Sequence, residues 1–168
     1  MDGKTVRESL LIMAQLMNPE DANPAGNVHG GAIMKLIDNA AGCVAVRHCR
    51  CNVVTASIDR LDFHNPVFVG DLVTLRSSLN YAGKTSMELG VRVEAENLLT
   101  GKRRHTASAY LTFVALDAQG HPTPVPQLIL ETDEEKRRNR EAKERLKTRM
   151  AEKTKEKQCQ NDMICPAY

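Results

Sequence analysis

The sequence of 168 residues contains no tryptophan, and aromatic residues of all kinds make up only 4% of it. Proteins that stack nucleic-acid bases depend on aromatic side chains, so this scarcity disfavours a nucleic-acid binder. Neither sign of charge is in large excess, because 23 basic residues and 21 acidic residues give a net charge of +2. Without a basic excess we expect no nucleic acid among the partners.

Long apolar runs and an export signal are absent as well. No stretch of about 18 apolar residues occurs, so we expect no membrane span, and the N-terminus lacks the basic and then apolar layout of a signal peptide. The five cysteines match no disulfide framework or zinc site: they are Cys43, Cys49, Cys51, Cys159 and Cys165. These absences predict a soluble, cytoplasmic protein with reduced thiols and no metal.

Several hydrolase signatures are missing too. The sequence has no Gly-x-Ser-x-Gly elbow, no Walker loop, no His-Glu-x-x-His pair and no Gly-x-Gly-x-x-Gly turn. A serine hydrolase, a nucleotide hydrolase and a zinc protease each need one of these motifs. At this length, with 42% apolar residues, the chain can bury one sizeable core.

The most informative segment that is present runs from Asn23 to Asp38 and joins a polar loop to an apolar helix with one carboxylate. Proline and glycine keep the loop irregular, and apolar residues at helical spacing predict a buried helix from about Gly30 to about Cys49. The first N–H groups of such a helix lie at the positive end of its dipole, so they can hold a carbonyl oxygen that gains negative charge. Asp38 lies about 12 Å further along the axis. A group bound at the helix N-terminus therefore meets Asp38 only by reaching down the helix, or a second chain contributes half of the site.

After this helix the sequence alternates between apolar and polar residues. Four strands are predicted in succession, near residues 53–61, 72–81, 87–95 and 107–113. In the third, Met87 and the apolar residues that alternate with it would face the core, while Glu88 and its charged neighbours would face water or a partner. One long helix followed by a meander predicts an α+β fold with a helix on one face of an antiparallel sheet.

The segment from residue 131 to residue 157 is almost entirely charged or polar, with a thin apolar stripe of Ala142, Leu146 and Met150. Its composition predicts a solvated helix, and a partner-binding coil is the alternative. Residues 158–168 are expected to be disordered. We therefore predict one domain at 1–132 and a charged helical tail at 133–168, and we expect hydrolysis to survive removal of the tail.

Three stretches of the sequence resemble the acyl-CoA thioesterases of the hotdog fold, most closely the brain acyl-CoA hydrolase type and its single-domain relatives. The most specific stretch is residues 21–31 followed by the helix with its acid, and residues 60–71 and 83–86 support it. The resemblance covers residues 5–132. It implies an antiparallel sheet wrapped around one long central helix, and hydrolysis of fatty acyl-CoA to free fatty acid and CoA without a cofactor.

The resemblance also implies a catalytic set. Asn23 and Asp38 would form the catalytic pair, with Asp38 as the base that activates water or, alternatively, as a nucleophile. Gly30 would donate its N–H to the thioester carbonyl, and His29 would have a positional role. The residues alone leave other interpretations open, because Asp38 also suits a solvated helical position and Asn23 also suits a turn.

The substrate-binding candidates are Gly31, Asn27, Lys84, Thr85 and Ser86. Glycine lets a thioester approach the backbone closely. The turn at residues 83–86 would meet a CoA phosphate through Lys84, although a plain hairpin turn explains it equally well. Arg103 and Arg104 are alternatives for this contact, whereas the polar residues of 60–65 are expected to stabilise the sheet edge.

Two other functions remain open at this point: a non-catalytic acyl-CoA-binding module, and another hotdog enzyme acting on acyl-CoA, such as a hydratase. The resemblance further implies how the chains assemble. Animal relatives carry two hotdog domains in one chain, whereas this sequence has one copy that must supply both Asn23 and Asp38. We therefore expect a homodimer with two sites across the subunit boundary, and hexamers built as trimers of dimers are the further expectation.

Overall fold

The structure is a computed structural model that describes residues 2–161. Its main sheet is antiparallel, with the strand order β2-β4-β5-β6-β3. The strands are β2 (Leu11–Leu16), β3 (Asn52–Phe63), β4 (Asp71–Ala82), β5 (Ser86–Asn97) and β6 (Arg103–Leu116). A short parallel pairing joins β1 (Lys4–Thr5) to β7 (Leu128–Ile129). The helices are α1 (Val6–Ser9), the 3₁₀ turn η1 (Pro19–Asp21), α2 (Gly30–Cys49) and α3 (Asp133–Asn161).

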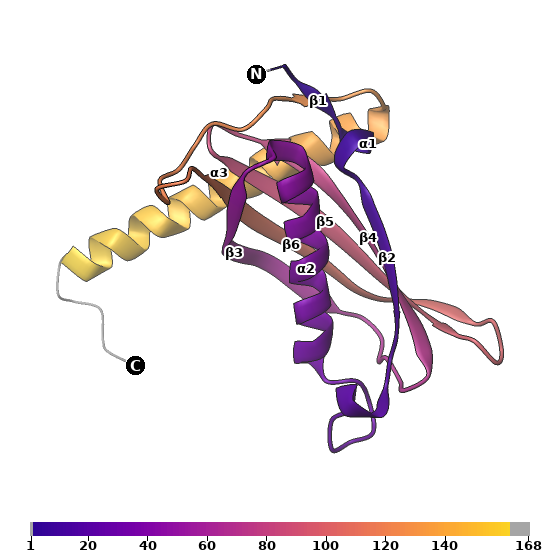
Figure 1. The fold of residues 1–168 in the computed structure, drawn as a ribbon. Helices are drawn as coiled ribbons and strands as arrows, with labels where there is room; N and C mark the ends of the chain where they lie inside the picture. Colours follow the sequence, from indigo (N-terminus) through magenta and orange to yellow (C-terminus); the bar gives the residue numbers. More distant parts are fainter. Residues whose placement is uncertain (1, 162–168) are drawn as a thin grey trace.

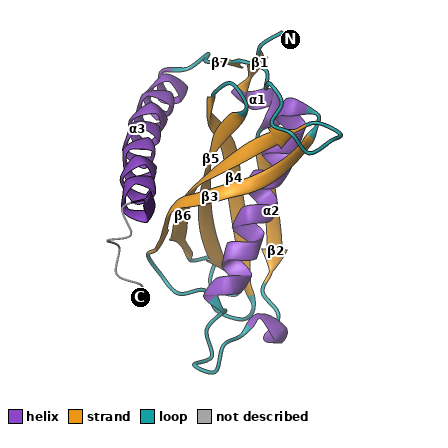
Figure 2. Cartoon of the chain, turned by 90° about the vertical axis from the view of Figure 1, so that its left-hand side faces the viewer, coloured by secondary structure: helices purple, strands orange, loops and turns teal. Residues whose placement is uncertain are grey.

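The sheet lies between two helices (Figure 1). Figure 2 shows α2 against one face and α3 along the opposite face, so the molecule has three layers. The predicted α+β fold, with an antiparallel sheet around one long helix and a further charged C-terminal helix, is confirmed. Within residues 2–161, no helix combines the length and the apolar character needed to cross a membrane.

Helix α2 has the predicted bounds and forms the centre of the core. Its apolar stripe packs on the sheet and is almost completely buried, as expected from the 3.6-residue spacing: Ile33, Ile37, Ala40, Ala41 and Val44. The helix ends where Arg50 adopts a left-handed conformation with φ of 56°. The helix thus fixes the position of everything on its opposite, solvent-facing side, including Asp38.

The four predicted strands are all present and extend beyond the predicted bounds. In β5 the inward residues are buried as predicted: Met87, Leu89, Val91, Val93 and Ala95. The edge strand β2 was not predicted. Its sequence lies in an apolar stretch with no alternating pattern, and its pairing with β4 creates the strand.

The prediction of a solvated C-terminal helix is wrong for one face of α3. Ala142 is fully buried and Asn139 nearly so, and the Asn139 side chain donates a hydrogen bond to the Asn80 carbonyl. Arg145 pairs with Glu88, which is 2% exposed. Polar groups make most of these contacts with the sheet, so the thin apolar stripe in the sequence did not reveal them. Residues 158–161 are helical rather than disordered, and the rest of that predicted disordered end, 162–168, lies outside the described residues.

Candidate active site

The loop before α2 is closed by the Asn23 side chain. Its Oδ1 accepts hydrogen bonds from the backbone N–H of Ala25 at 2.9 Å and of Asn27 at 3.3 Å, while the Asn23 N–H donates to the Asn27 carbonyl at 2.7 Å. Gly26 has φ of 85°, which favours glycine in this turn. Because Oδ1 is the acceptor, the two N–H bonds of the Asn23 amide are the groups available to a ligand.

His29 caps the helix and bonds to only one of the two glycines that follow it. Its Nδ1 accepts a hydrogen bond from the Gly31 N–H at 2.9 Å, so His29 is the N-cap of α2. The Gly30 N–H, by contrast, has no acceptor among the described residues. One free N–H therefore stands at the positive end of the α2 dipole, as the sequence predicted.

Asp38 lies on the half-exposed side of α2 and is held by a residue that sequence reasoning missed. The Thr55 hydroxyl, on β3, donates a hydrogen bond of 2.7 Å to Asp38 Oδ1. A threonine in a strand rich in β-branched residues gives no signal of its own. The tertiary structure of β3 and α2 brings Thr55 to Asp38.

Most of the residues of 60–71 anchor the loop, and Phe63 also lies beside Gly30, about 3.6 Å from where a Cβ would stand at that position. Val28 donates a backbone hydrogen bond to the Val67 carbonyl at 2.8 Å, and Asn65 donates one to the His105 carbonyl at 2.8 Å. Arg104 forms a largely buried ion pair with Asp71. The expectation of a structural role for Asn65 is confirmed, whereas Arg104 is not a surface charge free to meet a phosphate.

The turn that carries Lys84, Thr85 and Ser86 lies at the other end of the sheet. The loop before α2 lies at the same end of the sheet as the start of β4, because Leu16 at the end of β2 pairs with Leu72. The turn follows the end of β4, a strand of 12 residues that spans about 40 Å. Lys84 is exposed, yet within one chain it is remote from Gly30. The chain thus brings Asn23, Asn27, His29, Gly30 and Gly31 together, and it leaves Asp38 and this turn apart from them.

Other reactive groups are not arranged as a site in the described part of the chain. Residues 2–161 hold no cluster of three or more His, Cys, Asp or Glu side chains suited to a metal ion. Cys49 and Cys51 bring their sulfurs to 3.0 Å, and burial raises the pKa of Cys51 to about 11. A cavity of about 340 Å³ lies between α3 and the outer face of the sheet, and neither Asn23 nor Asp38 lines it.

Known proteins are similar to this chain in sequence and in fold. Residues 25–102 match the Thioesterase superfamily. The protein named uncharacterized acyl-CoA thioester hydrolase YkhA of Bacillus subtilis is 43% identical over 129 residues, which cover 77% of this chain and 75% of that protein. The chain belongs to the thioesterase superfamily. Its fold is therefore the hotdog fold that the resemblance implied.

Longer thioesterases match over part of their length. The cytosolic acyl coenzyme A thioester hydrolase of Rattus norvegicus is 43% identical over 143 residues, which cover 84% of this chain. Those residues make up 38% of that protein, so the chain spans well under half the length of this relative.

Solved thioesterase structures match nearly the whole chain. An apo-hexameric acyl-CoA thioesterase superposes with a TM-score of 0.87 at 41% identity, covering 90% of this chain and 97% of that one. The acyl-CoA hydrolase of Staphylococcus aureus, solved with butyryl coenzyme A and coenzyme A, superposes with a TM-score of 0.87 at 34% identity, covering 96% and 99%. Further structures of that hydrolase are alanine variants of an aspartate, an asparagine and a threonine.

Proposed function

We propose that this chain hydrolyses fatty acyl-CoA thioesters to free fatty acid and CoA, without metal or prosthetic group. The observation that carries the proposal is the combination of a free N–H at the head of α2 with a carboxylate, Asp38, that Thr55 holds on the open side of the same helix. In the three S. aureus variants, the replaced asparagine, aspartate and threonine follow one another at the same separations along the chain as Asn23, Asp38 and Thr55.

Each group has a defined task in this reaction. The Gly30 N–H and the α2 dipole stabilise the negative charge that develops on the thioester oxygen. Asp38 takes a proton from water as the water oxygen bonds to the carbonyl carbon. When the C–S bond breaks, the sulfur leaves with the electron pair and receives the proton that Asp38 took from water. The Asn23 amide donates to the thioester or orients the water.

Completion of the site requires a second chain in this proposal. Asn23 lies beyond the head of α2, and Asp38 lies about 12 Å along the axis from Gly30, so the two do not meet on one helix. β3 is an edge strand of the sheet, and apolar residues on β3 and α2 are exposed, including Val54, Ile58, Met34 and Val46. A two-fold dimer across this edge would cover them and bring Asp38 of one chain toward Gly30 of the other.

The same dimer would bring the partner's turn toward the CoA end of the site. Lys84, Thr85 and Ser86 would then contact phosphate or pantetheine, and Asn27 and Gly31 would line the loop beside the thioester. We further propose that three dimers form a hexamer, as in the hexameric thioesterase that resembles this chain, and that the protein is cytoplasmic, as the name of its rat relative states for that protein.

The test is the release of free thiol from palmitoyl-CoA by the purified protein. Asp38→Asn keeps the side-chain volume but removes the base, so we expect kcat to fall about 100-fold to 10,000-fold. Asn39→Ala, at an exposed neighbouring position on α2, is the matched control and should retain full activity. Circular dichroism checks that both variants are folded.

Two outcomes would reject the proposal in different ways. A folded Asp38→Asn protein that keeps more than about a tenth of the wild-type rate would show that Asp38 is not the base. Wild-type protein that binds palmitoyl-CoA without releasing thiol would be an acyl-CoA-binding module. Hydration of an enoyl-CoA without thiol release would instead indicate a hydratase.

A further inference from the structure

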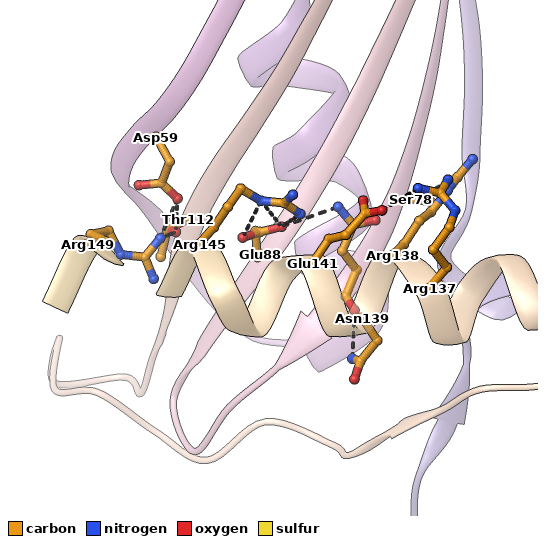
Figure 3. Close-up of polar contacts among 11 residues, drawn as sticks. Asp59, Ser78, Glu88, Thr112, Arg137, Arg138, Asn139, Glu141, Arg145 and Arg149 are labelled. Atoms are coloured by element: carbon orange, nitrogen blue, oxygen red, sulfur yellow. Dashed lines mark hydrogen bonds and ion pairs between the residues drawn. The ribbon is translucent and has the colours of Figure 1, made fainter. Parts of the chain in front are cut away.

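A network of polar side chains lies on the outer face of β3, just beyond the residue that holds Asp38. The Ser57 hydroxyl donates a hydrogen bond of 2.6 Å to Asp59 Oδ1, and the Thr112 hydroxyl of β6 donates one of 2.7 Å to Asp59 Oδ2. Arg149 of α3 forms an ion pair with Asp59 and also donates to Thr112. Figure 3 shows this contact toward the C-terminal end of the drawn part of α3.

The strand itself is irregular at this point. In a regular strand Thr55, Ser57 and Asp59 would share one face, because side chains alternate. Here Thr55 pairs with Phe113, whereas Ser57 pairs with Thr112. One extra residue between them forms a β-bulge, which turns Thr55 to the inner face and leaves Ser57 and Asp59 on the outer face. The bulge is therefore the reason that the Thr55 hydroxyl reaches Asp38.

Asp59 lies at a second irregularity. Ile58 pairs with Leu111 and Arg60 pairs with Tyr110, so Asp59 is the extra residue between two paired positions. Because β3 is an edge strand, β6 alone fixes its backbone within the chain, and each bulge interrupts that ladder. Within one chain, side-chain contacts add to this interrupted ladder in holding the segment between the bulges in place, and the contact from the outer face of the sheet comes from Arg149.

We propose that Arg149 is a positioning residue for the active site: it pins the bulged segment of β3 from the outer face and thereby holds Thr55 against Asp38. The side chains of Arg149 and Asp59 are 15% and 10% exposed, so loss of the guanidinium leaves a mostly buried carboxylate without its partner. The carboxylate then turns toward water, and the bulge moves with it. This role deepens the proposed hydrolase function and rests on it, and it contradicts the expectation that hydrolysis survives removal of residues 133–168.

The experiment compares arginine variants of α3 in the full chain. Arg149→Ala should lower kcat about 10-fold to 100-fold, the range expected when a reacting group is misplaced by about 1 Å, with KM changed by less than about 2-fold. Arg149→Lys keeps a positive charge beside Asp59, so its kcat should lie between that of Arg149→Ala and that of wild type. Arg138→Ala is the matched control, because Arg138 also lies on α3 but contacts Ser78 of β4, and its kcat should stay at the wild-type value.

A double-mutant cycle separates positioning from general stabilisation. If Arg149 acts through Thr55, then Thr55→Ala combined with Arg149→Ala should be no slower than Thr55→Ala alone. A structural role elsewhere would make the two losses add. Multiplicative losses, or an unchanged kcat in folded Arg149→Ala protein, would overturn the proposal.

A readout without turnover keeps this proposal distinct from the hydrolase proposal. Amide hydrogen exchange across β3 should speed up in Arg149→Ala and not in Arg138→Ala, whatever the substrate. If wild-type protein releases no thiol, the hydrolase function fails, and the exchange result still decides whether Arg149 holds the strand. Unchanged exchange in β3 would overturn the positioning role even in an active enzyme.

Discussion

At the scale of single residues, the two glycines at the head of α2 have different neighbours, so substituting each with alanine should change a different property of the protein. A Cβ at position 31 would lie 3.0 Å from His29 Nδ1, whereas a Cβ at position 30 would meet Phe63 at an ordinary 3.6 Å. Gly31→Ala should therefore displace the cap and destabilise the protein by about 0.5–2 kcal/mol. Gly30→Ala should keep its stability and lose kcat, because the new methyl group crowds the N–H proposed to bind the carbonyl.

Thermal unfolding and thiol release, measured side by side on both glycine variants, check this division. Asn39→Ala serves again as the neutral helix control. Equal losses of stability in the two variants, with equal rates, would show that the N–H of Gly30 has no special part in the reaction.

His48 should make stability depend on pH. Its side chain is fully buried at the end of α2, and a ring nitrogen lies 2.9 Å from the Pro126 carbonyl. Burial is the main cause that lowers the pKa of His48, and the hydrogen bond to Pro126 opposes it in part. The unfolded chain therefore binds a proton more readily than the folded one, and stability is lost as the pH falls through about 6.5.

Urea unfolding between pH 7.5 and pH 5.5 measures this effect. His48→Gln, which can still donate to the Pro126 carbonyl, should show a flatter decline in the free energy of unfolding than wild type. His121→Gln, at an exposed position, should decline as wild type does. Parallel curves for wild type and His48→Gln would assign the acid sensitivity to other groups.

At the scale of elements, α3 is held on the sheet by a small number of buried polar contacts. Arg145 stacks over the Tyr110 ring at 3.8 Å and pairs with Glu88 at 2.6 Å. Arg145→Ala removes the charged partner of Glu88, which is 2% exposed, so we expect a loss of about 3–5 kcal/mol in the free energy of unfolding. Arg137→Ala, which breaks only exposed pairs with Glu134 and Glu141, should leave the melting temperature unchanged. Equal melting temperatures for both variants would mean that α3 is not packed as described.

The elements also show which parts of this structure a sequence can predict. The bounds of α2 and the inward face of β5 follow from local periodicity, because one buried face imposes its own spacing on the residues. The docking of α3 was not predicted, since most of its contacts with the sheet join polar side chains, as in the pair of Arg145 and Glu88, and give the sequence little apolar periodicity. The role of Thr55 did not follow either, because it depends on one extra residue in β3 that turns the side chain to the other face.

At the scale of the whole molecule, the central prediction is that one chain is not a complete enzyme. Asn23 and Gly30 lie at one end of α2, Asp38 lies about 12 Å further on, and the Lys84 turn lies beyond the far end of β4. A two-fold axis across the β3 edge would bring the two halves together. Asn23→Ala and Asp38→Ala proteins, each inactive alone, should then regain activity when their subunits are exchanged, because one of the two sites in a mixed dimer carries both native residues.

Native mass spectrometry of differently tagged subunits gives the fraction of mixed dimers, and thiol release from palmitoyl-CoA gives their rate. Because a mixed dimer has one intact site out of two, its rate should approach half that of a wild-type dimer. Asp38→Ala mixed with Thr55→Ala is the control: these residues contact each other within one chain, so each site of that mixed dimer lacks one of them, and the pair should not complement. Mixed Asn23→Ala and Asp38→Ala dimers that form in full and remain inactive would place the whole site within a single subunit.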